Sequence, residues 1–375
     1  KPAGDLFMNM IKMLIVPVIF FSVTSGIAAI GDVQRLKRIG SKVVIVYFLM
    51  TVIACIVGIV MVNITHPGVG FTLDNMQAFD TSKVKTPSFV NFLFDMVPVN
   101  IVDSMAKNQI MQMIFFTVLV GVALVSLGEK VAGVTKIFDQ CASIIYKMLD
   151  IVMLYSPIGV LALMANTTAV FGPKLFGVLA KFVFTDWVGC LLIWFFFSGI
   201  VWLYTKVNYL EMCKSMIPIW VNTIATNSSA GTIPITLNVT TERLKVPMSI
   251  ASFSIPLGAT INLTGAALYK TILAFFVAEI YGLQLTIDQI LMVIIISTIM
   301  SIAAPGIPGG GIVTGAIFLN LLGLPMDLMG PIAGMYRLID MSHTTVNVSG
   351  DVLGTMLVAK NENIWTGEDF NKTLV

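Results

Sequence analysis

The stretch DMSHTTVNVSGD at residues 340–351 decides how this chain is interpreted, because it places polar side chains inside an apolar segment. In a helix, five of them fall at i, i+3, i+4, i+7 and i+11 and share one face: Asp340, His343, Thr344, Asn347 and Asp351. A carboxylate at membrane depth costs about 2.5–3.5 kcal/mol, so such groups usually face a protein interior and mark an ion or substrate path. A stripe that only joins helices by hydrogen bonds is the simpler alternative, but it would not require two aspartates.

The composition explains why charge is unexpected here. Of 375 residues, 57% are hydrophobic and only 11% are charged, whereas a soluble domain carries about 25% charged residues. The chain is therefore predicted to be a polytopic membrane protein. Its net charge of +2 gives no electrostatic basis for binding nucleic acid. Four scattered cysteines and two histidines indicate neither a disulfide framework nor a zinc site.

Nine apolar stretches are long enough to lie within a membrane, where a spanning helix needs about 20 residues. Two of them are broken by NSSAGTIP at 227–234 and AAPGIPGGG at 303–311. Irregular backbone at that depth is tolerated only where it is buried in protein or lines a cavity. We therefore predict re-entrant hairpins at 209–236 and 287–321, each made of two half-helices. The seven predicted spans are 6–31, 43–64, 109–127, 137–168, 178–205, 247–281 and 327–359.

The second half of the chain repeats its own pattern. AGTIP (230–234) precedes a long apolar helix with NLTG (262–265), and APGIP (304–308) precedes one with NVSG (347–350). Internal repeats of this kind are typical of secondary transporters.

Lys and Arg are concentrated in the loop 33–42, which the positive-inside rule places in the cytoplasm. The polar loop 65–88 is then extracellular. The tail at 361–375 is cytoplasmic if both broken segments turn back.

The chemistry of these motifs fits a small zwitterion and a hard cation. Half-helix N-termini near Ser228, Ser229 and the glycines 309–311 would offer N–H groups to a carboxylate. Asp340 suits an ammonium group, so the set describes a clamp for an α-amino acid. An alkali cation prefers hard oxygen ligands. Such ligands are available from Asp351, Asn262, Asn347 and the carbonyls near Gly258.

Two other functions are less consistent with the sequence. An intramembrane aspartyl protease needs two carboxylates that share a proton, but Asp340 and Asp351 lie roughly 16 Å apart along one helix. We therefore predict that the chain is not an enzyme. An ion channel could use the broken stretches as a pore lining, but it would not need an amino-acid clamp.

These motifs resemble the dicarboxylate/amino acid:cation symporters, a family that includes glutamate, aspartate and neutral amino acid transporters. The resemblance runs over nearly the whole chain and is most specific in SSAGTIP, LGATINLTGAALY, APGIPGGG and DMSHTTVNVSGD. It implies an all-α, glutamate-transporter-like fold with inverted repeats, which works as an elevator in a homotrimer in the plasma (inner) membrane. The family has one more helix before the position where this chain begins.

The resemblance also implies a division of each protomer into a scaffold and a transport domain. The scaffold would comprise 1–42 and 89–170, the latter with the trimerisation helices. The transport domain would comprise 43–64 and 171–360, with hairpin 209–236, helix 247–281, hairpin 287–321 and helix 327–359.

Site residues are carried over position by position. Substrate contacts are expected at Asn227, Ser228, Ser229, Ala266, Ile307, Gly311, Asp340, His343, Thr344 and Asn347. One sodium site is expected at Gly258, Asn262, Asn347 and Asp351. A second is expected at Thr260, Ser301, Ile302 and Ala304, where Ala304 replaces a usual threonine. A weakened third would use Tyr47, Thr51 and Thr264.

Departures from the family pattern bear on the substrate. His343 replaces the arginine that holds an acidic side chain, Ala266 replaces a threonine that assists it, and Thr264 replaces an aspartate at the third sodium site. Asn227 replaces an arginine or serine, and Tyr336 replaces an aspartate. Because the planar fork of arginine is missing, we expect sodium-coupled symport of a neutral amino acid with fewer than three sodium ions. In the alternative, protonated His343 binds an acidic amino acid or C4-dicarboxylate and makes transport proton-linked.

Overall fold

The structure is a computed structural model that describes the chain as an assembly of helices. The described residues are 2–28, 39–70, 94, 96–107, 109–155, 157–159, 161, 162, 165, 169, 174–302 and 309–372. No strand occurs in these ranges, and the prediction of an all-helical chain is confirmed for them.

The first half contains shorter helices beside two long ones. Its elements are α1 (Pro2–Met13), α2 (Ile15–Val18), the π-helical turn η1 (Ile19–Val23), α3 (Thr24–Ala28), α5 (Ser41–Thr65), α7 (Ile101–Ala106), α8 (Ile110–Leu127), η4 (Gly128–Val131) and α9 (Ala132–Leu154). The spans expected at 43–64 and 109–127 correspond closely to α5 and α8. The span expected at 6–31 is instead a series of short helices, and α9 ends well before the predicted end at 168.

The second half carries the polar motifs. Its elements are α11 (Lys174–Thr205), α12 (Tyr209–Thr226), α13 (Ser229–Asn238), η5 (Val239–Arg243), α14 (Met248–Ile261), α15 (Thr264–Ile280), α16 (Ile287–Ile302), α17 (Gly310–Leu321), α18 (Met329–Asn361) and α19 (Gly367–Asn371).

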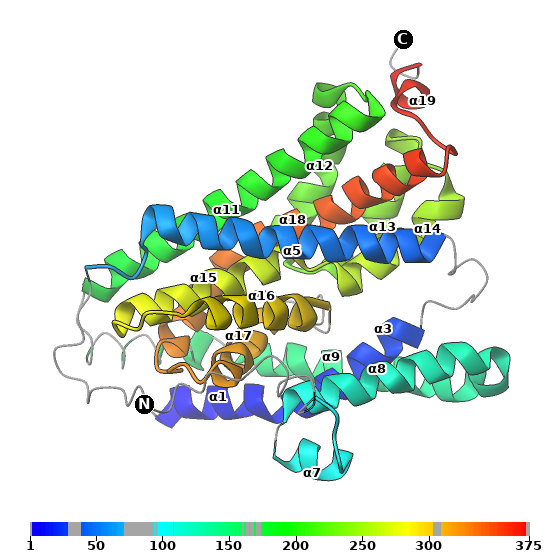
Figure 1. Cartoon of the computed structure of the whole chain (residues 1–375). Helices are drawn as coiled ribbons and strands as arrows, with labels where there is room; N and C mark the ends of the chain where they lie inside the picture. Colours follow the sequence, from blue (N-terminus) through cyan, green and yellow to red (C-terminus); the bar gives the residue numbers. More distant parts are fainter. Residues whose placement is uncertain are drawn as a thin grey trace.

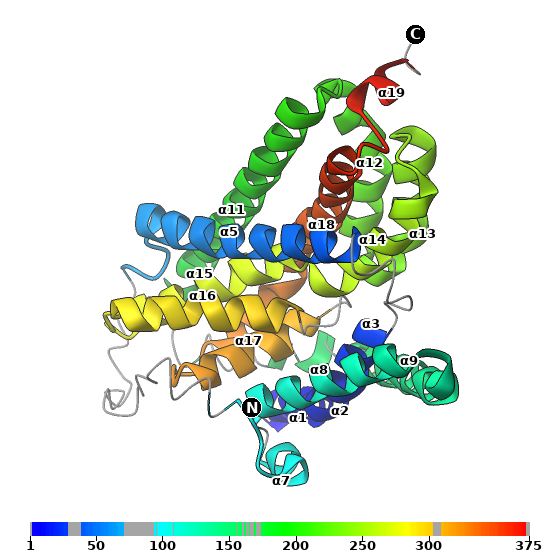
Figure 2. The same ribbon diagram turned by 45° about the vertical axis from the view of Figure 1, so that its right-hand side comes forward.

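The helices pack in two groups (Figures 1 and 2). α1 to α3 contact α8 and α9, and they form the lower layer of Figure 1. The larger group is built around α18, which contacts α5, α11, α12, α14, α15 and α17. The assignment of these groups to a scaffold and a transport domain stays a prediction.

The chain does not form the single continuous helix predicted for 247–281, because the helix is interrupted in the middle of this range. α14 ends at Ile261, and Asn262 and Leu263 have ψ angles of 57° and 61°, outside the helical range. This interruption leaves backbone groups without helical partners, and it lies inside the protein. Asn262 and Leu263 are 0% and 3% exposed, and in the most apolar 18 residues of Met248–Ile280 94% are buried, compared with 22% in those of Gln112–Ile145. Protein rather than lipid therefore surrounds the break, as irregular backbone at membrane depth requires.

Both broken stretches consist of two helices, as expected. Between α12 and α13 the chain reverses at Asn227, which has a left-handed φ of 52°. Hydrogen bonds attach α12 to α18. Among them, Trp220 Nε1 donates to Ser349 Oγ (3.0 Å), and the Thr223 and Thr345 hydroxyls lie 2.9 Å apart. The tip between α16 and α17 lies outside the described residues, and re-entry from one side of the membrane stays a prediction.

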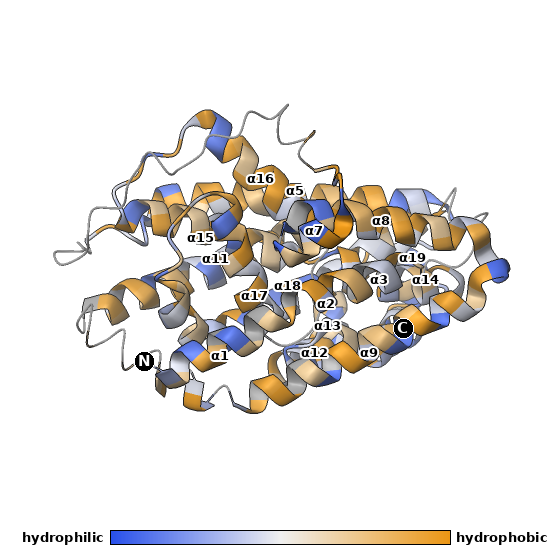
Figure 3. Cartoon of the chain, turned by 90° about the horizontal axis from the view of Figure 1, so that it is seen from below, coloured by the Kyte–Doolittle hydropathy of each residue, from blue (hydrophilic) through white to orange (hydrophobic). Residues whose placement is uncertain are grey.

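The outer surface is suited to lipid. Within the described residues, four helical stretches are long and apolar enough to cross a membrane: Ser41–Thr65, Gln112–Ile145, Leu175–Thr205 and Met248–Ile280. Hydrophobic residues cover most of α8 (Figure 3), and many of its large side chains are exposed, among them Leu119 and Val122. The exposed apolar surface is explained if these helices face acyl chains.

Candidate functional site

The polar face of α18 points into the protein. Asp340, His343, Thr344, Asn347 and Asp351 are all between 1% and 8% exposed. The neighbouring helices α11, α14, α15 and α17 cover this face. Buried polar groups must be hydrogen-bonded or paired, so their partners indicate what the site can bind.

Asp340, on α18, lies next to the N-terminal end of α17. Its Oδ2 accepts from Gly309 N (3.2 Å) and its Oδ1 accepts from Tyr336 Oη (3.3 Å). Gly309 has a φ of 76° and caps the helix. A side chain at Gly311 would overlap the Tyr336 ring, so the glycines allow α17 to approach α18 closely. In the described part of the chain, Asp340 forms no salt bridge, and its carboxylate can still accept from a bound ammonium group.

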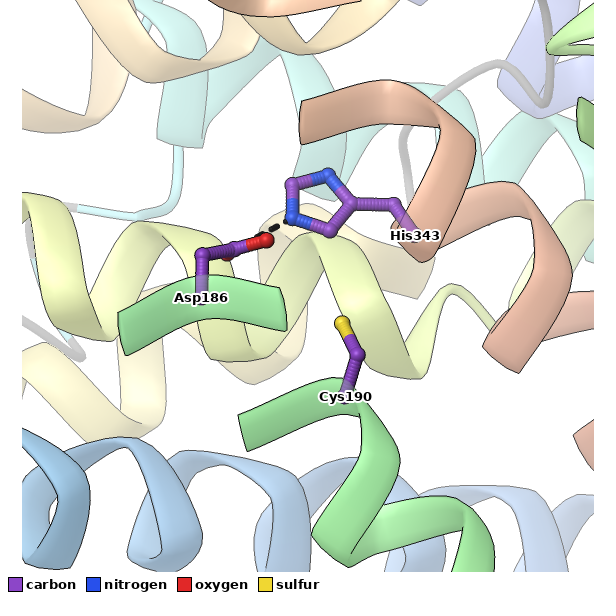
Figure 4. Close-up of side chains that lie close together, drawn as sticks. All are labelled: Asp186, Cys190 and His343. Atoms are coloured by element: carbon purple, nitrogen blue, oxygen red, sulfur yellow. Dashed lines mark hydrogen bonds and ion pairs between the residues drawn. The ribbon is translucent and has the colours of Figure 1, made fainter. Parts of the chain in front are cut away.

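His343 is paired with a residue that the sequence analysis missed. Its Nε2 lies 2.8 Å from Oδ1 of Asp186 on α11, and both side chains are buried (Figure 4). Ser342 Oγ donates to the other Asp186 oxygen at 3.1 Å. The second ring nitrogen of His343, Nδ1, is buried without a hydrogen-bond partner among the described residues. One edge of the imidazole is therefore fixed and the other is available to a ligand.

Cys190 lies one helical turn after Asp186 and completes a cluster of three metal-ligand types. Potential ligand atoms of Asp186, Cys190 and His343 lie within 4.8 Å of one another (Figure 4). These are residue types that bind zinc. Here, however, Nε2 of His343 already bonds to the Asp186 carboxylate. The cluster is therefore better described as a histidine whose orientation is fixed by Asp186. Cys190 also borders an apolar cavity of about 300 Å³ between α11, α12 and α18; its apolar lining does not suit a charged substrate.

The residues expected to touch substrate from the first broken stretch meet α18 at the turn. Asn227 is buried, and its Nδ2 donates to the Arg337 carbonyl at 3.0 Å while its Oδ1 has no partner among the described residues. Ser229 is buried beside it, and Ser228 caps α13 by accepting from Gly231 N at 3.0 Å. Arg337 itself is exposed, which places its guanidinium outside the buried polar face.

Residues at the start of α15 also cover the polar face of α18. Asn347 Oδ1 accepts from Gly265 N at 2.7 Å, directly after the break in the helix. A Cβ on Gly265 would lie 2.6 Å from His343 Cα, so α15 and α18 touch backbone to backbone here. Ala266 packs with Leu263 in a small cluster separate from the main core. Thr344 is buried on the same face, whereas Ile307 lies outside the described residues.

The first expected sodium site fits a cation. Asp351 is 1% exposed, and Asn262 Nδ2 donates to its Oδ1 at 2.9 Å. In the described ranges it has no cationic partner. A Cβ on Gly258 would overlap the Asp351 carboxylate, so only glycine allows the α14 backbone this close. A buried carboxylate, an amide and nearby carbonyls are the hard oxygen ligands that an alkali cation prefers.

The third expected site does not fit a separate cation. Tyr47 Oη donates to the carbonyls of Ser254 (3.0 Å) and Asp351 (3.2 Å). Thr51 Oγ1 donates to Tyr47 O, and Thr264 Oγ1 donates to Asn262 Oδ1. The hydroxyl groups of all three residues therefore already donate hydrogen bonds within the protein. None of these neutral groups can offset the charge of an ion at low dielectric.

The second expected site also departs from the requirement for a cation. Thr260 Oγ1 donates to Leu257 O at 2.7 Å, and Ile302 is the last residue of α16. Ser301 Oγ instead accepts from the ammonium of Lys270 at 3.2 Å. Ala304 lies outside the described residues. The ammonium group of Lys270 therefore contacts Ser301, one of the residues expected to bind the second sodium ion.

The comparisons with known proteins agree with this arrangement of helices and buried polar groups. The model of the sodium:dicarboxylate symporter family matches residues 1–361. The chain belongs to that family. Over 99% of its length it is 31% identical to a proton/glutamate-aspartate symporter of Bacillus subtilis, covering 90% of that protein. It is 32% identical to a C4-dicarboxylate transport protein of the same organism, with 97% and 87% covered. A proton/sodium-glutamate symport protein of Bacillus caldotenax is 30% identical, with 98% and 88% covered.

Membership of the sodium:dicarboxylate symporter family confirms the resemblance seen in the motifs. The protein is a multi-pass protein of the plasma membrane, and members of its family are transporters. The names of these relatives agree with the stated alternative of an acidic substrate better than with the neutral amino acid that we favoured.

Proposed function

We propose that this protein is a symporter of an acidic amino acid or a C4-dicarboxylate, driven by sodium or protons. The observation that carries the proposal is the orientation of His343. Its Nε2 bonds to buried Asp186 while its buried Nδ1 has no partner among the described residues. An imidazolium in this orientation has one N–H for Asp186 and one N–H for a substrate carboxylate.

Asp186 explains how a histidine could replace arginine in this role. The Asp186 carboxylate lies 2.8 Å from Nε2, where it can accept a hydrogen bond from the ring and would balance the charge of an imidazolium. The other groups around the ring are Cys190 on α11, Tyr269 on α15, and Tyr336 and Asp340 on α18. The ring centroid of Tyr269 lies 5.3 Å from that of His343. The aromatic side chains exclude water, which strengthens a charge-assisted hydrogen bond to the substrate.

Asp340 distinguishes the two substrate classes. Its carboxylate lies on the same face one turn before His343, and it would bind the ammonium group of an α-amino acid. A C4-dicarboxylate has no such group and would place a second anion there. Because the Asp340 carboxylate forms no salt bridge among the described residues, it favours the acidic amino acid of the two.

Movement of the site across the membrane is proposed from the family resemblance and the two packing groups. The group around α18 would carry the bound substrate as an elevator against the layer formed by α1–α3, α8 and α9. The broken stretches α12–α13 and α16–α17 would act as re-entrant hairpins on either side of the site. A homotrimer is proposed on the same resemblance.

The test is substrate-dependent thermal stabilisation of the purified protein, because a ligand of the folded state raises its apparent stability. Aspartate, glutamate and C4-dicarboxylates would be compared with asparagine, serine and alanine at about pH 5.5 and about pH 7.5, with sodium or choline. We expect stabilisation by acidic ligands, strongest at the lower pH. Stabilisation by the neutral amino acids alone would refute the acidic substrate.

The variant Asp340→Asn tests the ammonium contact separately. Loss of a charge-assisted hydrogen bond of about 1.5–3 kcal/mol should weaken aspartate binding by roughly 10- to 150-fold. Binding of a C4-dicarboxylate should not weaken, because that ligand loses a repulsive charge. Isothermal titration with both ligands measures the difference, and equal losses would show that Asp340 does not contact the amino group.

A further inference from the structure

Lys270 is a charged residue that the proposed transport cycle does not use. It lies on α15 and is 0% exposed, among the largest fully buried side chains of the protein. A lysine in a membrane helix usually extends its ammonium group to the interface. This one is enclosed between α5, α15 and α16, which pack against one another.

The ammonium of Lys270 is held by neutral oxygens. Nζ donates to the carbonyl of Ala266 and to Ser301 Oγ, both at 3.2 Å. Among the described residues it forms no salt bridge, and the titratable side chain that affects it is the thiol of Cys55 on α5. Neutral hydroxyl and carbonyl oxygens around a dehydrated monovalent cation are also the surroundings of a bound alkali ion.

A sodium ion bound by Ser301 would compete with this ammonium. Two unit charges about 5 Å apart at an effective dielectric of 20 repel strongly enough to weaken ion binding by several hundredfold. The carboxylate that could compensate, Asp351, bonds instead to Asn262 on the other side of the helix break. The expected second sodium site and the charged lysine are therefore mutually exclusive.

We propose that the Lys270 ammonium is a tethered cation that takes the place of a coupling ion beside Ser301. While it is protonated, the lysine supplies from the chain itself a charge that would otherwise be bound and released in each cycle. This chain then binds one sodium ion fewer than the family pattern implies, and among the described residues Asp351 is the only carboxylate left to bind sodium. The proposal concerns the ion and does not depend on which substrate is carried.

The experiment counts radiolabelled sodium bound per chain at equilibrium, on the purified full chain without substrate. We expect at most one ion in the wild type and one additional ion in Lys270→Gln, where an amide oxygen replaces the ammonium. Lys270→Arg keeps the charge and should bind as the wild type does. Lys107→Gln, which removes an exposed lysine directly after α7, is the matched control and should also leave the count unchanged.

Three results would overturn the proposal. They are two or more ions in the wild type, an unchanged count in folded Lys270→Gln, and an additional ion in Lys270→Arg. If Lys270→Gln does not fold, as judged by size-exclusion chromatography and thermal unfolding, Asp351→Asn decides. That variant removes the one carboxylate expected to bind sodium and should bind none; any remaining stoichiometric ion would show that a second site is open despite the lysine. Because no substrate is present, these results are independent of the acidic-substrate proposal.

Discussion

Asp186→Asn tests whether the buried carboxylate makes His343 an anion-binding group. Asparagine keeps the size of the side chain and can still accept a hydrogen bond from Nε2, but it removes the charge. A hydrogen bond that involves a charged group contributes about 1.5–3 kcal/mol. Affinity for an acidic substrate should therefore fall by roughly 10- to 150-fold at neutral pH. The loss should be confined to ligands with a second carboxylate, because a neutral amino acid does not use this charge.

The assay is isothermal titration of the acidic ligand across a pH series, for the wild type, Asp186→Asn, His343→Gln and the double variant. If both residues act through one proton, Asp186→Asn should cost far less in the His343→Gln background than alone. Asp288→Asn, which removes an exposed carboxylate from the first turn of α16, should change neither affinity nor pH profile. Losses that are additive within about 0.5 kcal/mol would refute the reasoning.

Two glycines allow further tests. Gly258→Ala places a Cβ against the Asp351 carboxylate, so sodium should no longer stabilise the purified protein. Circular dichroism should show that the fold remains. Normal sodium binding by this variant would place the ion elsewhere. Gly265→Ala places a Cβ 2.6 Å from His343 Cα, and overpacking of this kind costs about 1–3 kcal/mol, so its unfolding temperature should fall. Gly177→Ala, with nothing within 4 Å of the added Cβ, should instead gain up to about 1 kcal/mol from helix propensity; a Gly265→Ala variant as stable as this control would contradict the close approach.

Helix positions and the direction of the polar face could be predicted from sequence because both follow from periodicity. The stripe from Asp340 to Asp351 is buried along α18, as its spacing on one face indicated. The break at Asn262–Leu263 could not be predicted in the same way. It contains neither proline nor the run of glycines that marked 303–311, and the chain is apolar on both sides. The interruption is stabilised by tertiary contacts, including that of Asn347 with the Gly265 amide.

Asp186 was missed although the sequence contains a signal for it. It is an isolated carboxylate in the apolar stretch FTDWVGCLL, and a carboxylate within a membrane segment usually has a functional partner. What the sequence cannot give is the identity of that partner. His343 lies 157 positions further along the chain, and one-dimensional periodicity relates residues only within a helix. The packing of α11 on α18 brings the two together.

The buried charges of the group around α18 suggest how a mobile domain could carry ions and an anionic substrate through a medium of low dielectric. Uncompensated charge is costly there, so each carboxylate needs a cation. Asp186 has His343 as its partner, and Asp340 is left for the ammonium group of a substrate. Asp351 has an amide as its hydrogen-bond partner, and we propose that a coupling ion balances its charge. Lys270 is the remaining buried cation in the described ranges and lacks a carboxylate of its own. Its charge takes the place of a coupling ion beside Ser301, so the sodium count should follow Lys270 whichever substrate is carried.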